Sequence, residues 1–284
     1  MKKLFLYGCA VTAFSLSLSV ALRGIRAQEK KTEATRTLAG VQLSPATTKL
    51  LAKVEALYGV PVRIATNSNM IPGAHGREYV NGDGTPVIEL DPRIGMSEEI
   101  VVHELMHLLL WAEGVRDVIL VSGEPEVRSL IFDIDQQVLH AYFFPRIRDM
   151  GLDPNVSGKA DMQWVKDEHQ PRYDVKLDEL GEAKLGIEYF TCVAVLQDEE
   201  YGAALEKNGF PLGDREAGRR GRAAVALTKR NFSTPEEELS VFIGVSNILL
   251  EGVYHLSVMS VDDHKRGKFT MKEAKVNVER VAFK

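Results

Sequence analysis

The chain has 284 residues, of which 45% are hydrophobic and 26% are charged. A chain of this length and composition can bury a sizeable core, which excludes an intrinsically disordered protein. Its formal net charge is −5 at pH 7. An acidic chain without a recognised nucleic-acid-binding motif repels phosphate backbones, so we expect no nucleic-acid partner.

The first 27 residues have the pattern of an export signal. An apolar run over residues 4–22 lies between two lysines and two arginines, and Ala27 offers a cleavage point. We therefore expect a periplasmic or secreted protein. Because the run is long, an uncleaved N-terminal membrane anchor is the alternative. Cleavage would take the net charge from −5 to −9 and leave Cys192 as the remaining cysteine.

Residues 28–43 are polar and lack a helical or strand period, which predicts a linker. A helix is then expected from Ser44, as N-cap, to about Gly59. A short strand over residues 61–65 follows. Next comes a hairpin with strands over residues 77–80 and 86–90, joined by a turn with the sequence Asn-Gly-Asp-Gly. Pro86 favours an edge position for the second of these strands.

Two helices are expected after the hairpin. The first has Ser97 as its N-cap and ends at Gly114. The second begins near Pro125 and runs to about Phe144, where Pro145 should end it.

The rest of the chain predicts further helices. Residues 151–182 are rich in charged residues and glycine and indicate a long loop, after which helices are expected over residues 182–205 and 234–258. The arginines within residues 209–222 indicate a solvated basic loop. The fold class is therefore helix-rich α+β, with a small antiparallel sheet. Residues 44–150 are expected to form a catalytic core and residues 151–284 a helical C-terminal region.

The pentapeptide His103-Glu104-Leu105-Met106-His107 carries the chemistry. On a helix, residues four apart lie on one face, so both imidazoles can reach one Zn²⁺ while Glu104 points at the metal-bound water. Two surface histidines are the alternative, but Val102, Met106 and Leu110 would then leave unpaired imidazoles on an apolar face. The motif therefore predicts a zinc site for metal-assisted hydrolysis.

A catalytic zinc site needs a third protein ligand. Glu126 is the choice, because eighteen residues separate it from His107 and it lies in the first turn of the next helix. Glu124, just before that helix, is the second candidate. His140, considered as an oxyanion-stabilising group, shares a helical face with Glu126 but lies about 21 Å further along the axis, so a structural role is expected for it.

This pattern, HELMH followed by eighteen residues and Glu126, resembles the gluzincin branch of the zincin metallopeptidases. The sequence Glu-Pro-Glu-Val-Arg over residues 124–128 is also similar to the acidic helix opening of minimal gluzincins. The resemblance covers residues 60–145. It implies a zinc peptidase in which His103, His107 and Glu126 bind the metal, and a peptide or protein substrate.

In the expected mechanism, Glu104 accepts a proton from the attacking water and returns it to the leaving amine. Asp133 is a candidate hydrogen-bond partner for a ligand ring. The strand over residues 87–90 is a candidate edge for pairing with an extended peptide. Cys192 lies in an apolar helical run and is expected to be a buried structural thiol. The candidates for an oxyanion-stabilising group are His140, Tyr142, Tyr173, Tyr189, Tyr254 and His255.

Three functions are weighed against one another. The first is an exported zinc peptidase with Glu104 as general base. The second keeps the zinc and the water but has a non-peptide amide or ester as substrate, which the same mechanism permits. The third is a non-catalytic zinc-binding envelope protein. Replacement of Glu104 by glutamine separates the enzymes from the third function, because it should retain the metal and abolish turnover.

Overall fold

The computed structural model describes residues 37–70, 74–115, 118–122, 125–155, 179–203, 216–229, 232–250, 255–258 and 276–277. For residues 118–122, 125–126, 255–258 and 276–277 only the backbone is described. The predicted export signal lies outside these ranges, and so do residues 28–36 of the predicted linker. Within the described ranges, no helix combines the length and the apolar character needed to cross a membrane.

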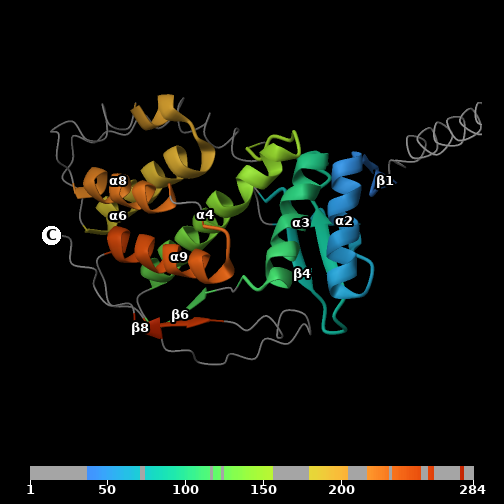
Figure 1. Ribbon diagram of the computed structural model, residues 1–284, viewed down its shortest axis with the longest axis horizontal. Helices are drawn as coiled ribbons and strands as arrows, with labels where there is room; N and C mark the ends of the chain where they lie inside the picture. The colour runs from blue at the N-terminus through green and yellow to red at the C-terminus, as the bar shows by residue number, and fades with distance from the viewer. Residues whose placement is uncertain are drawn as a thin grey trace, which may run out of the picture.

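The predicted class is confirmed: the fold is helix-rich α+β with small sheets (Figure 1). At one end, α2 (Pro45–Tyr58) and α3 (Glu98–Glu113) pack together beside a three-stranded sheet. At the other end lie α6 (Glu179–Phe190), α8 (Glu216–Thr228) and α9 (Pro235–Leu250). The long helix α4 (Pro125–Asp149) runs between the two ends and contacts both α3 and α9.

The two helices at the first end have the predicted caps. The Ser44 side chain accepts a hydrogen bond from the Thr47 N–H at the start of α2, and the Ser97 side chain accepts one from the Ile100 N–H at the start of α3. Gly59 and Gly114 end these helices with φ angles of 74° and 109°, a conformation that favours glycine. The helix that carries the histidine motif therefore forms as its sequence indicates.

The sheet beside α3 has the order β3-β5-β4, formed by β3 (Arg63–Thr66), β5 (Pro86–Leu90) and β4 (Gly76–Val80). The predicted hairpin is confirmed, since β4 and β5 pair antiparallel. The predicted edge position of residues 87–90 is wrong, because β5 also pairs in parallel with β3 and is the central strand. Pro86 is the first residue of β5. A proline at this position removes little of the backbone hydrogen bonding between the strands.

Helix α4 extends through Pro145 to Asp149, so the predicted end at Pro145 is wrong. Proline in a helix removes one backbone hydrogen bond and crowds the preceding turn. The side chains of Phe143, Phe144 and Ile147 are almost completely buried on either side of it. Their burial offsets the local cost of the proline and continues the helix for one more turn.

A short antiparallel pair, β1 (Thr37–Leu38) and β2 (Val41–Gln42), occupies part of the predicted linker, which is therefore structured over these residues. The side chains of Val41 and Leu43 are 7% and 0% exposed, so this segment is anchored by burial. The two strands are too short to show the alternation of apolar and polar residues by which a strand is recognised in a sequence, so they were not predicted.

The C-terminal half departs further from the prediction. Helix α6 passes into a π-helix, η1 (Thr191–Leu196), which ends at Gln197 with φ 57°, so no single helix spans residues 182–205. Of the arginines expected in a solvated loop, Arg219, Arg220 and Arg222 lie in α8, and Arg215 lies outside the described residues. Arg220 among them is only 7% exposed and donates hydrogen bonds to Glu216 Oε1 and to the Leu249 carbonyl.

A second three-stranded sheet also went unpredicted. Helix α9 ends at Leu250, and β7 (His255–Val258) occupies the last four residues of the helix expected over residues 234–258. Strand β7 pairs antiparallel with β6 (Val118–Ser122) and with β8 (Val276–Asn277). Strand pairing thus joins residues of the predicted core to residues of the predicted C-terminal region. Most of the loop expected over residues 151–182 lies outside the described residues.

Candidate metal centre

Three of the seven histidines meet between α3 and α4. His103 and His107 lie one turn apart on α3, and His140 lies on α4. One ring nitrogen from each of the three lies within 4.8 Å of those of the other two. The Nε2 atoms of His103 and His107 are 3.3 Å apart. These residues form a histidine cluster that could hold a metal ion.

The spacing of the two rings on α3 fits shared coordination. In a tetrahedral site with zinc–nitrogen bonds of about 2.0–2.1 Å, two ligand nitrogens lie about 3.3–3.4 Å apart. The separation of 3.3 Å between the two Nε2 atoms has this value. Imidazole is a ligand for zinc, copper, iron and nickel alike, so the cluster indicates a transition-metal ion as a class.

The imidazoles of the histidine cluster are neutral at pH 7. Burial, with a smaller contribution from the nearby His75, lowers the pKa of His103 to about 4. Burial and the neighbouring imidazoles hold the pKa of both His107 and His140 well below the usual value. A neutral ring has a nitrogen lone pair to offer, so the cluster has the protonation state that a metal ligand requires.

Two phenylalanines of α4 support the rings. The ring of Phe143 is fully buried and meets His103, His107 and His140 edge-on, with centroid distances of 5.3, 4.9 and 5.3 Å. Phe144 stacks on His140 with a centroid distance of 4.9 Å. These contacts restrict the orientation of the imidazoles and surround them with apolar groups, which strengthens electrostatic interactions within the site.

Glu104 lies beside the histidine cluster with its carboxyl group against strand β4. It is 5% exposed, and its Oε1 atom would be 2.6 Å from a Cβ added at Gly76, so only glycine leaves room there. Burial, followed by the negative charge of Glu78 and a hydrogen bond to it, raises the pKa of Glu104 well above its usual range. Glu78 Oε1 also lies 3.9 Å from Nδ1 of His107.

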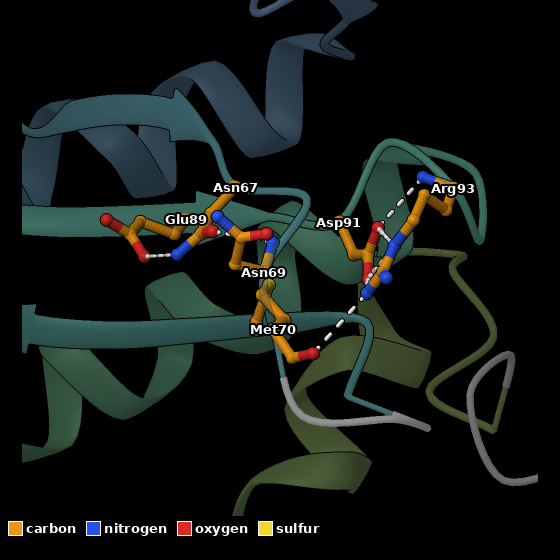
Figure 2. Close-up of polar contacts among 6 residues, drawn as sticks. All are labelled: Asn67, Asn69, Met70, Glu89, Asp91 and Arg93. Atoms are coloured by element: carbon orange, nitrogen blue, oxygen red, sulfur yellow. Dashed lines mark hydrogen bonds and ion pairs between the residues drawn. The ribbon is translucent and has the colours of Figure 1, made fainter.

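Polar contacts at the end of β5 hold the segment that leads into β4 (Figure 2). Arg93 donates hydrogen bonds to both oxygens of the buried Asp91 carboxylate, the shortest at 2.5 Å, and one to the Met70 carbonyl at 3.4 Å. The Asp91 N–H in turn donates to the His75 carbonyl at 3.0 Å. Because His75 precedes Gly76, these contacts place the start of β4 against Glu104.

The structure places His140, for which a structural role was expected, in the histidine cluster as a possible metal ligand. The side chain of Glu126, the predicted third ligand, lies outside the described residues, and Glu124 lies outside them altogether. The two positions are alternatives, since α4 is continuous from Pro125 and separates Glu126 from His140 by fourteen residues, about 21 Å along its axis. Glu126 as a ligand stays a prediction.

The other candidate residues have mixed outcomes. Cys192 is buried, as predicted. Asp133 is exposed, and the carboxyl group found beside a ligand ring is that of Glu78. Tyr142 donates its hydroxyl hydrogen bond to the Ser233 carbonyl. Tyr173 and Tyr254 lie outside the described residues, as does the side chain of His255.

The sequence held a partial signal for the residues that were missed. His140, Phe143 and Phe144 share one face of α4 at the spacing i, i+3, i+4, and a histidine on an aromatic face of a second helix is a candidate third ligand. No sequence pattern near Glu78 or Gly76 indicates that they belong to the site. They approach Glu104 only because β4 pairs with β5.

Comparison of the chain with protein-family models, with curated proteins and with solved structures gives no match. The assignment of function therefore rests on the geometry and chemistry of the histidine cluster and of Glu104.

Proposed function

We propose that this protein is a zinc-dependent peptidase of the zincin type, with Glu104 as general base. The observation that carries the proposal is the convergence of three neutral imidazoles, two of them separated by the edge length of a tetrahedral zinc site, next to a buried carboxyl group. A zinc ion in such a site supplies Lewis acidity and an acidified water ligand.

The residues of the chain have distinct roles in this proposal. His103, His107 and His140 hold the metal through ring nitrogens. Glu104 takes a proton from the water as its oxygen bonds to the substrate carbonyl carbon, and gives that proton to the leaving amine as the carbon–nitrogen bond breaks. Burial and the negative charge of Glu78 raise the pKa of Glu104, which makes its carboxylate a stronger proton acceptor.

The position of strand β4 favours a peptide as the substrate. Among the described residues, β4 pairs with β5 on one side only, so it is an edge strand. It passes Glu104 at Gly76 and Glu78. An extended peptide can add to an exposed sheet edge through backbone hydrogen bonds, which would bring a scissile bond beside the histidine cluster. This edge replaces the one expected at residues 87–90.

The central test combines metal content with turnover in the full chain. We expect one zinc ion per chain and cleavage of casein that a chelator abolishes. Glu104→Gln should retain the zinc and lower kcat by about 10²–10⁴-fold, because it removes the proton acceptor. Glu113→Gln is the matched control on the same helix, since Glu113 is paired with Lys53 and Arg146 at the far end of α3.

Three outcomes would contradict the proposal. If Glu104→Gln keeps wild-type activity, Glu104 is not the base. If zinc binds and casein is not cleaved while small esters or amides are, the protein is a zinc hydrolase of non-peptide substrates. If zinc binds and none of these substrates is turned over, the protein is a non-catalytic zinc-binding protein.

The third ligand is tested by a pair of substitutions on α4. His140→Ala should lower zinc affinity at least 100-fold, and Glu126→Ala should leave it unchanged, because the two positions are too far apart on the helix to bind one ion. The reverse result would assign the site to the ligand set of the gluzincins, two histidines and a glutamate.

Export belongs to the same proposal. Its support is the sequence pattern of residues 1–27. N-terminal sequencing of the protein recovered from cell fractions tests it. A mature chain that begins near residue 28 outside the cytoplasm is expected, whereas an intact N-terminus in the membrane fraction would indicate the anchor.

A further inference from the structure

Glu78 links the candidate general base to a candidate metal ligand. We propose that Glu78 is a positioning residue, whose carboxyl group orients the imidazole of His107 through Nδ1 and confines the carboxyl group of Glu104. The proposal rests on the proposed function, because it assigns Glu78 a role in orienting the groups of that same site. Three features of the structure support it.

The first feature is the orientation of His107. Its Nε2 atom faces Nε2 of His103 at 3.3 Å, so Nε2 is the nitrogen directed into the histidine cluster. Its Nδ1 atom lies 3.9 Å from Glu78 Oε1, a distance that a small movement would close to a hydrogen bond. Metal-binding histidines usually donate their second N–H to a carboxylate or carbonyl, which selects the tautomer and raises ligand basicity.

The second feature is the confinement of Glu104. Its carboxyl group is hydrogen-bonded to that of Glu78. On its other side, Gly76 leaves no space for a Cβ, which would be 2.6 Å from Glu104 Oε1. Glu104 therefore has its carboxyl group held between two residues of the same strand.

The third feature separates positioning from ligation. Among the described residues, the group of side chains whose ligand atoms approach one another within 4.8 Å consists of the three histidines and does not include Glu78. The side chain of Glu78 is 16% exposed and faces α3. The neighbouring Arg77 and Tyr79 face the other side of the sheet, where both donate hydrogen bonds to Glu89. Glu78 thus contacts the site without belonging to its ligand set.

The experiment compares leucine and glutamine at position 78 in the full chain. Glu78→Leu keeps the volume of the side chain and removes both interactions. We expect its zinc affinity, measured by competition with a chromophoric chelator, to fall about 10–100-fold. The absorption spectrum of the Co²⁺-loaded protein should change, and kcat should fall more than KM changes. Glu78→Gln should recover most of the affinity, because an amide can accept from Nδ1–H and donate to Glu104.

A packing role predicts a different pattern, since leucine in place of a buried carboxyl group should preserve or improve stability. Tyr79→Phe is the control on the outer face of the same strand and should leave zinc affinity unchanged. Wild-type zinc affinity and an unchanged Co²⁺ spectrum for Glu78→Leu would overturn the proposal. A wild-type chain that binds zinc without hydrolysing peptides would contradict the proposed function alone, because the affinity comparison still tests Glu78.

Discussion

Figure 1 shows the two ends of the molecule, on either side of α4. They differ in how their polar side chains are paired. In the helical end, the nearly buried guanidinium of Arg220 is held by Glu216 and by the Leu249 carbonyl. Between α3, α4 and β4, groups of the same kind lie together, buried or half-buried: three imidazoles in one cluster and two carboxyl groups in one hydrogen bond.

Opposite charges that pair support a fold, whereas like groups buried together reduce its stability unless a ligand compensates them. A protein that retains the second arrangement does so for function, because local conflicts with stability concentrate at functional sites. The comparison therefore favours the histidine cluster as the candidate functional site, whereas the Arg220 pair supports the fold.

The largest effect is expected from removal of a buried aromatic ring at each end. Phe143→Ala and Phe242→Ala should each lower the free energy of unfolding by about 3–5 kcal/mol, because both rings are fully buried. Only Phe143 contacts the three imidazoles, so only its replacement should also weaken zinc binding. Chemical denaturation and zinc titration measure the two effects.

Phe143→Leu provides a milder variant for the zinc titration, since it retains an apolar side chain. Equal losses of zinc affinity for the Phe143 and Phe242 variants would remove the distinction between the two ends of the molecule.

The next effect is the acid sensitivity of the metal-free protein. The pKa of His103 is lowered from 6.5 to about 4, so between these pH values the unfolded chain binds a proton that the folded chain excludes. The stability that this group contributes is present above pH 6.5 and is lost as the pH falls towards 4. Allowing for its partial exposure, we expect a loss of about 2 kcal/mol from His103.

Denaturation of chelator-treated protein at several pH values measures this loss. His103→Gln should flatten the curve over the same window. An unchanged stability between pH 6.5 and 4 in the wild-type chain would show that the imidazole is free to protonate in the folded protein.

Gly76→Ala should lower stability less than the acid-induced loss from His103, and its main effect should be on activity. The added Cβ would meet the end of the Glu104 side chain, which can move at a cost of about 1 kcal/mol. The displaced carboxyl group should lower kcat, while zinc affinity changes little. Gly82→Ala is the control, because an added Cβ there meets nothing within 4 Å. Wild-type kcat for Gly76→Ala would contradict the confinement of Glu104.

The smallest effect is expected from Glu216→Gln in the helical end. Hydrogen bonds from Arg219, and then from Arg220, lower the pKa of Glu216 to about 2. The stability that it contributes is present above pH 4.5 and is lost as the pH falls towards 2, below the window of His103. Since its side chain is 39% exposed, the substitution should cost less than about 1 kcal/mol at pH 7. Zinc affinity should not change, and a measurable change would connect the two ends.

Local signals predicted much of the structure around the site. Capping by Ser44 and Ser97, with Gly59 and Gly114 at the ends, placed α2 and α3 correctly, and the turn after Val80 placed the hairpin. The spacing of His103 and His107 alone put both rings on one helical face. These features depend on hydrogen bonds and side chains only a few residues apart, which a sequence pattern records directly.

Features that depend on distant packing were missed. The continuation of α4 through Pro145 depends on the burial of Phe143, Phe144 and Ile147, which no local rule for proline includes. The pairing of β6 with β7 joins strands more than 130 residues apart, and both strands are short. Arg220 looked like a solvated charge because its partner carbonyl belongs to another helix.

By itself, the sequence determined that two imidazoles and a carboxyl group share one helix, since their spacing matches the helical period. Only the tertiary structure decided what completes the site. His140 joins the histidine cluster because α4 crosses α3 at that position, and Glu78 reaches Glu104 because β5 places β4 beside α3. Contacts between elements depend on the packing of whole faces, and no short stretch of sequence contains that information.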